Sequence, residues 1–127
     1  MTETAWRADG PAPLSVNVSH SDRPGVLLAM VNGEMDYGNT HRLGAALGDS
    51  PGTGADIVLD LSGLTFCDSS ALGALVALHK RTTAAGGRLF LVHLRPQVAD
   101  AISVTSLDQL LRVRDSVETV LAETDRA

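Results

Sequence analysis

Hydrophobic and polar residues follow one another along this chain in a pattern that predicts short strands and helices. Leu14 to Val18 alternates apolar with polar residues, which is typical of a half-buried strand. Val26 to Val31 is an apolar run, which is typical of a more fully buried strand, and turn residues from Ser21 to Gly25 separate the two. Because a parallel return needs a long crossover, the two strands are predicted to form an antiparallel hairpin.

The rest of the chain is predicted to alternate helices with strands. A modest apolar stripe over Tyr37 to Leu47 predicts a helix that is short or irregular, because Gly38 and Gly44 weaken it. Further strands are expected at residues 56–61, 88–94 and 107–113, the last with a possible helical turn at Leu107, and further helices at residues 70–84, from Pro96, and after Asp115 and Ser116. Strand-helix-strand units require parallel pairing with right-handed crossovers. The predicted fold class is α/β, a mixed sheet opened by an antiparallel hairpin and covered by helices, in one domain over residues 14–124 after a disordered leader, residues 1–13.

One stretch in the middle of the chain concentrates polar residues where a helix begins. A buried strand is predicted to end at Ser62 and Gly63, and Asp68, Ser69 and Ser70 precede the next apolar pattern at helical spacing. Asp and Ser are preferred there, since their oxygens accept hydrogen bonds from the free N–H groups of the first turn. Ser69 is therefore predicted near the surface at the positive end of a helix dipole, as an inert cap, a nucleophile or a phosphate acceptor.

A second polar segment, Gly33 to Asp36, comes directly after the second predicted strand. Gly33 permits a backbone conformation that a β-carbon would oppose. Asp36 is placed to cap the helix predicted from Tyr37, and together with Glu34 it also fits simple solvation of a strand end.

The helix after Ser69 is predicted to carry a face of small residues. Counting by three and four from Ser69 gives Gly73, then Val76 or Ala77, and then Lys80. Small side chains lose little entropy on contact and suit the close approach of a partner protein. The alternative is that this face packs under another segment of the chain.

Composition limits the function classes that remain. The chain has 127 residues, 44% of them hydrophobic, and a mean hydropathy of +0.10, which fits one compact domain. A net charge of −5, a pI near 5.1 and 3% aromatic residues argue against direct contact with nucleic acid. No secretory h-region and no bilayer-length apolar run is present, so a cytoplasmic protein without a membrane partner is expected.

The sequence offers little for catalysis or metal binding. Cys67 is the single cysteine, so no internal disulfide or cysteine zinc cluster can form, and the four histidines are not at metal-ligand spacings. Ser69 lacks the flanking glycines of a hydrolase elbow, and no glycine-rich phosphate loop with its lysine exists. We therefore expect a protein that is not an enzyme and needs no metal or cofactor of its own.

Two segments carry a resemblance to a known family. The run from Asp68 to Gly73, Asp-Ser-Ser-Ala-Leu-Gly, follows a buried strand and Phe66 and resembles the phosphorylation-site segment of bacterial anti-sigma factor antagonists, which are single STAS domains. Gly33 to Asp36, Gly-Glu-Met-Asp, is similar to the Gly-Glu-Leu-Asp segment of the same family, in which the aspartate lies beside the phosphorylatable serine. The resemblance extends over about residues 14–121 and implies the same order of elements.

The resemblance implies a switch in protein binding. The unphosphorylated form would bind an anti-sigma factor that is also a serine kinase and so free a sigma factor, and phosphorylation of Ser69, or of Ser70 in a second choice, would end binding. ATP would belong to the partner, and a phosphatase would reverse the modification. The residues implied in partner binding are Asp36, Asp68, Ser69, Ser70, Gly73, Val76, Ala77 and Lys80.

One departure and two alternatives stay open. The family usually has glycine where Ala71 stands, and the extra methyl could alter the fit of a partner against the first helical turn. The same fold also serves purely as a contact module in lipid-transport or stressosome-like assemblies, which predicts stable binding without phosphate on Ser69. A hydrolase that uses Ser69 is the more remote alternative and predicts labelling by a serine-directed electrophile.

Overall fold

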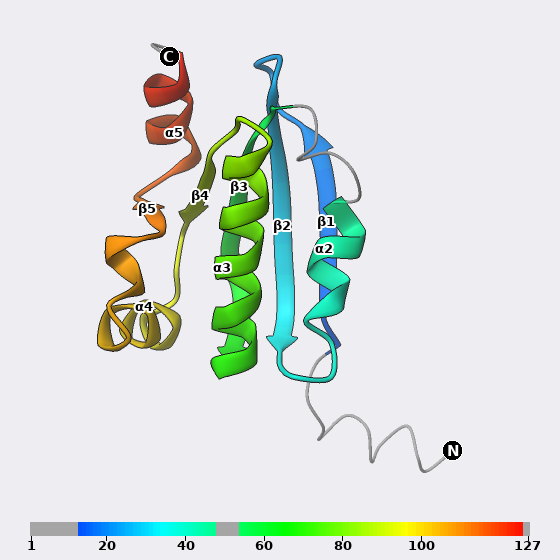
Figure 1. Cartoon of the computed structure of the whole chain (residues 1–127), viewed down its shortest axis with the longest axis vertical. Helices are drawn as coiled ribbons and strands as arrows, with labels where there is room; N and C mark the ends of the chain where they lie inside the picture. Colours follow the sequence, from blue (N-terminus) through cyan, green and yellow to red (C-terminus); the bar gives the residue numbers. More distant parts are fainter. Residues whose placement is uncertain (1–12, 48–53, 126–127) are drawn as a thin grey trace.

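The computed structural model describes residues 13–47 and 54–125, and its centre is a five-stranded mixed sheet (Figure 1). The strands lie in the order β1-β2-β3-β4-β5 across the sheet. In chain order the elements are β1 (Ser15–His20), β2 (Val26–Met35), α2 (His41–Leu47), β3 (Asp56–Cys67), α3 (Ser69–Ala84), β4 (Leu89–Val92), α4 (Pro96–Val104), the 3-10 helix η2 (Leu107–Gln109), β5 (Arg112–Arg114) and α5 (Val117–Thr124).

The topology confirms the predicted fold class. β1 pairs antiparallel with β2, and the other three neighbouring pairs are parallel. The turn between β1 and β2 contains Gly25 at a φ of +82°, a left-handed conformation that glycine adopts without steric cost. The described part of the chain therefore starts with the expected hairpin and continues through strand-helix-strand units.

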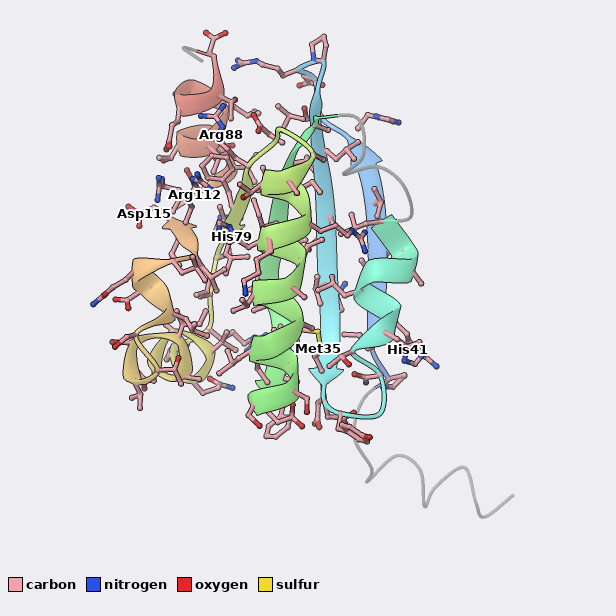
Figure 2. The ribbon with its side chains drawn as sticks, in the orientation of Figure 1. Met35, His41, His79, Arg88, Arg112 and Asp115 are labelled. Carbon is pink, nitrogen blue, oxygen red and sulfur yellow. The ribbon has the colours of Figure 1, made fainter. Side chains whose placement is uncertain are left out.

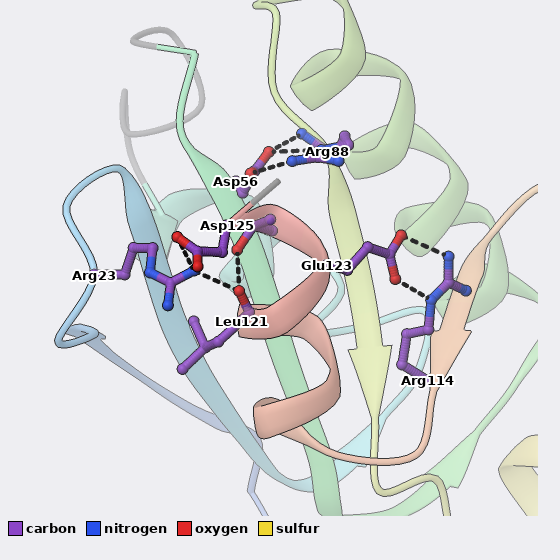
Figure 3. A network of polar contacts seen from close by, with 8 residues as sticks. Arg23, Asp56, Arg88, Arg114, Leu121, Glu123 and Asp125 are labelled. Carbon is purple, nitrogen blue, oxygen red and sulfur yellow. Dashed lines mark hydrogen bonds and ion pairs between the residues drawn. The ribbon is translucent and has the colours of Figure 1, made fainter. Parts of the chain in front are cut away.

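Helices cover the two faces of the sheet unequally. On one face α2, α3 and α4 lie over the main core, to which they contribute buried residues such as Leu43, Leu75 and Ile102 (Figure 1). On the other face α5 is the one described helix, and it lies over β3 and β4 (Figure 3). Its Val120 packs with Val58 and Phe90. None of the described helices is long and apolar enough to cross a membrane.

The two central strands are longer than the sequence predicts. β2 continues past Val31 to Met35, and β3 continues past Ser62 and Gly63 to Cys67, so these two residues do not end the strand. Pairing persists because the register shifts on either side of the Asn32–Gly63 pair, and glycine allows the close approach there. A β-carbon at Gly63 would lie only 1.8 Å from the Asn32 Oδ1 atom.

The remaining boundaries differ from the predicted ones by shorter stretches. α2 begins at His41 instead of Tyr37, and α3 begins at Ser69 instead of Ser70. β4 stops at Val92 because His93 turns into the left-handed region at a φ of 58°. The last strand, predicted over residues 107–113, is confined to Arg112–Arg114, and the helical turn expected at its start is the 3-10 helix η2. Residues 1–12 of the predicted leader lie outside the described residues.

Candidate functional site

The site lies where the parallel strands β2 and β3 end side by side. The last pair in their register is Met35 with Cys67, so the segments that follow both strands leave the sheet at one edge. The Asp68 amide donates a hydrogen bond to the Met35 carbonyl over 3.4 Å. Met35 and His41 lie toward the end of the sheet where α3 begins (Figure 2). The two polar segments singled out in the sequence are therefore neighbours in space.

Asp68 joins the two segments through its carboxylate. Its Oδ1 atom accepts a hydrogen bond from the Ala71 amide at 2.9 Å, which makes it the N-cap of α3. Its Oδ2 atom accepts one from the Tyr37 amide at 3.1 Å, in the loop before α2. Each oxygen thus has a backbone donor, which suits a structural role better than that of a proton acceptor for Ser69.

Asp36 caps a turn and not the helix that the sequence predicts for it. Its Oδ1 atom accepts a hydrogen bond from the Gly38 amide at 2.9 Å, and its carbonyl accepts hydrogen bonds from the Asn39 and Thr40 amides at 3.1 Å each. The side chain itself folds back onto the backbone two residues on, as aspartates in turns often do. The helix begins only at His41, one turn later than expected.

Ser69 is the first residue of α3 and is exposed, whereas Ser70 is half-buried. Within the part of the chain that the structure describes, no group forms a hydrogen bond with the Ser69 hydroxyl. A free, exposed hydroxyl at a helix N-terminus is accessible to an incoming phosphoryl donor, and the helix dipole favours a negative group there.

The departure at Ala71 lies inside the protein. Its side chain is completely buried and belongs to the main core. The methyl group that could have altered the fit of a partner therefore points away from the surface, and it fills space beneath the first turn of α3.

The face of small residues on α3 is open to solvent. Gly73, Ala77 and Lys80 are exposed and Val76 is half-buried, so the face does not pack under another described segment. The buried side of the helix is instead formed by Ala71, Leu72, Leu75, Leu78 and Thr82. Ala77 also lines a shallow pocket of about 180 Å³ that lies between α3 and α2.

Two further observations concern the chemistry of the side chains around the site. Burial, together with the charge of Asp68, raises the pKa of the Cys67 thiol to about 11, so this cysteine stays protonated and unreactive near neutral pH. Among residues 13–47 and 54–125, no group of three or more His, Cys, Asp or Glu side chains is arranged to hold a metal ion.

Two aromatic residues next to the site were not among the residues that the sequence analysis expects to bind a partner. Tyr37 has 84% of its surface exposed and Phe66 has 46%, although bulky aromatic rings are normally buried. Each lies within two residues of one of the acidic residues, Asp36 and Asp68. The available signal was their rarity, since the whole chain has one tyrosine, two phenylalanines and one tryptophan.

Comparisons with known proteins agree with one another. A model of the STAS domain matches residues 17–120. An anti-sigma F factor antagonist of Paenibacillus polymyxa is 23% identical over 112 residues, which are 87% of this chain and 96% of the relative. A Thermotoga neapolitana protein, provisionally named an anti-sigma factor antagonist, is 33% identical over 67 residues; the match spans 53% of this chain and 59% of the relative, less than two thirds of its length. The crystal structure of an anti-sigma factor antagonist from Mycobacterium paratuberculosis superimposes with a TM-score of 0.74 at 25% identity, covering 87% of this chain and 93% of the other.

Proposed function

This chain belongs to the STAS domain family, and from that premise we propose that it is an anti-sigma factor antagonist whose binding is switched off by phosphorylation of Ser69. In the unphosphorylated state it binds an anti-sigma factor with serine-kinase activity and frees a sigma factor in the cytoplasm. The anti-sigma factor supplies the ATP and the catalytic groups, and this chain is the substrate and not the enzyme. A phosphatase returns the chain to its binding state.

The observation that carries the proposal is the exposed Ser69 hydroxyl on a rigid helix start. The Asp68 cap and its bond to the Tyr37 amide fix the backbone on both sides of the site. A fixed acceptor lowers the entropic cost of aligning the hydroxyl with a phosphoryl donor. Ser70 is half-buried, which makes it the poorer acceptor.

The chemistry requires little from this chain beyond the hydroxyl. The Ser69 Oγ atom forms a bond to the γ-phosphorus of ATP, the bond from that phosphorus to the β,γ-bridging oxygen breaks, and ADP leaves. The hydroxyl proton must pass to a base. Because both Asp68 oxygens already accept backbone hydrogen bonds, we assign that base to the partner.

The phosphate would act on the interface more than on the fold. It adds about −1.5 to −2 charges. In the free protein the dipole of α3 favours that charge by about 0.3–1 kcal/mol, while Asp68 and Asp36 oppose it, so the two effects nearly cancel. Lys80 is about three helical turns away and cannot neutralise it. Against a docked surface shaped for a neutral hydroxyl, the unpaired charge is costly to bury.

The test uses purified anti-sigma factor kinases of the host, incubated one by one with this chain and ATP. We expect one phosphate by intact mass, placed on Ser69 by fragmentation, no phosphate on Ser69→Ala, and normal modification of Ser70→Ala. The dissociation constant for that kinase in ADP should rise at least tenfold on phosphorylation, with nearly unchanged circular dichroism and melting temperature. Equal affinities of the two forms would overturn the switch, and stable binding to a partner without kinase activity would favour the scaffold role instead.

A further inference from the structure

Two aromatic side chains in the segments next to Ser69 are exposed to solvent. Of the three aromatic residues in the described ranges, Phe90 is fully buried, but Phe66 is 46% exposed and Tyr37 is 84% exposed. The rest of the buried core consists mostly of aliphatic side chains. We propose that Tyr37 and Phe66 are the anchor residues through which the anti-sigma factor kinase docks, a proposal that rests on the proposed function.

Both residues are tied to the backbone that presents Ser69. Tyr37 donates its amide hydrogen to Asp68, the residue directly before Ser69, over 3.1 Å. Phe66 precedes Asp68 by two residues and pairs across the sheet with Glu34. Tyr37 thus follows the end of β2 and Phe66 lies near the end of β3, in the two segments whose backbones meet next to Ser69.

The backbone under each ring is held in place before any partner arrives. The turn that carries Tyr37 is closed by the Asp36 side chain and carbonyl. Next to Phe66, the Thr65 hydroxyl donates a hydrogen bond to the Gly33 carbonyl at 3.2 Å, and the Thr65 carbonyl accepts one from the Gln97 side-chain amide at 2.9 Å. Rigid aromatic groups lose little conformational entropy on docking, which is why tyrosine and other aromatics dominate the binding energy of many interfaces.

The position of Ser69 determines which partner must cover these rings. A kinase has to bring the γ-phosphorus of its bound ATP within about 3–3.5 Å of the serine oxygen to transfer the phosphoryl group. Exposed side chains within three residues of Ser69, or on a residue that is hydrogen-bonded to Asp68, then lie against the kinase surface. The occupant is therefore the kinase itself, with an apolar recess beside its nucleotide site that receives one or both rings.

A matched control is found elsewhere in the described part of the chain. Val104 is as exposed as Tyr37, at 84%, but it ends α4 and belongs to neither of the two segments that meet next to Ser69. It therefore provides a matched control for the loss of exposed apolar surface.

The test measures the dissociation constant between this chain and the purified kinase that phosphorylates it, in ADP so that no transfer occurs. Tyr37→Ala and Phe66→Ala should each weaken binding at least tenfold, while Tyr37→Phe and Val104→Ala should stay within twofold of the unchanged chain. In phosphorylation assays the two alanine variants should raise KM and leave kcat nearly unchanged, because the rings bind the kinase but do not touch the reacting atoms.

The outcomes separate this inference from the proposed function. If both alanine variants bind within twofold while phosphorylation of Ser69 still weakens binding, the aromatic anchors are refuted and the switch stands. If no kinase binds the unchanged chain, both are overturned. Should Phe66→Ala unfold, Tyr37→Ala decides alone, since a side chain with 84% of its surface in solvent can be shortened without opening the core.

Discussion

Asp68 illustrates how one residue organises the site. Its carboxylate accepts hydrogen bonds from the Ala71 amide in α3 and from the Tyr37 amide in the loop before α2, so one side chain fixes the two segments relative to each other. The first contact is local and could be predicted from the Asp-Ser-Ser cluster before an apolar helix. The second joins residues 31 positions apart, and nothing in either segment alone indicates it.

Replacing Asp68 should therefore lower stability by an amount typical of a lost helix cap. We expect Asp68→Ala to reduce the free energy of unfolding by about 1–2 kcal/mol, because the Ala71 amide loses its acceptor. Asp68→Asn should restore part of this, since its single side-chain oxygen can accept one of the two hydrogen bonds. Urea unfolding followed by circular dichroism measures both. Asp100→Ala, at an exposed position on α4, is the control, and an Asp68→Ala midpoint as high as that control would contradict the role.

At the level of secondary structure, local and long-range signals disagree most in the two central strands. Ser62 and Gly63 are typical strand terminators, and the sequence accordingly predicts an end there. Pairing with β2 overrides that preference, because Gly63 has no side chain to collide with Asn32 and the Asp60 side chain accepts the Ser62 amide at 2.9 Å. The extension carries both strands to the site edge at Met35 and Cys67. Such an override depends on the partner strand and so could not be predicted from the glycine itself.

A substitution at Gly63 tests this explanation. Gly63→Ala would place its β-carbon 1.8 Å from Asn32 Oδ1 and 3.3 Å from Asn32 Cα, so the strands must separate or the side chain must move. We expect a loss of about 1–3 kcal/mol in the free energy of unfolding, as for other overpacked sites. Adding Asn32→Gly removes the colliding amide and should recover most of it. A double-mutant cycle by urea unfolding gives the coupling, and strictly additive effects would show that the Asn32 side chain is not the obstacle.

Over the whole molecule, the sequence could establish the architecture but not which helix covers which face. A short connection between two strands requires an antiparallel hairpin, and strands that alternate with helices require parallel pairing through right-handed crossovers. The order of hydrophobic segments along the chain was therefore enough to predict the topology. α5 is a short amphipathic helix by sequence, and only the structure places it on the second face, over Phe90 and Val58 and apart from the other described helices. Two kinds of contact hold it there, apolar packing and the polar contacts that Arg23 and Arg114 make with its C-terminal half (Figure 3).

The two kinds of contact should contribute very differently to the stability of the molecule. Val120 is fully buried on the side of α5 that faces the sheet. Val120→Ala should lower the free energy of unfolding by about 1.5–3 kcal/mol, through lost burial and the cavity left behind. In the Arg114–Glu123 ion pair, the Arg114 Nε atom lies 2.7 Å from the Glu123 Oε1 atom. The two side chains are still 32% and 36% exposed, so solvent screens their charges, and the pair should stabilise the protein by about 0.2–1 kcal/mol.

Acid titration gives a second way to separate the two contributions. The hydrogen bonds from Arg114 hold the pKa of Glu123 below its usual range. The contribution of the pair is therefore complete above the pKa of the unfolded state and is lost as the pH falls through the lowered pKa of the folded state. Glu123→Gln should change the unfolding midpoint slightly at pH 7 and not at all once both states are protonated, whereas Val120→Ala should cost the same at either pH. If Glu123→Gln destabilises the protein at pH 7 as much as Val120→Ala does, the ion pair and not the apolar contact holds α5 on the sheet.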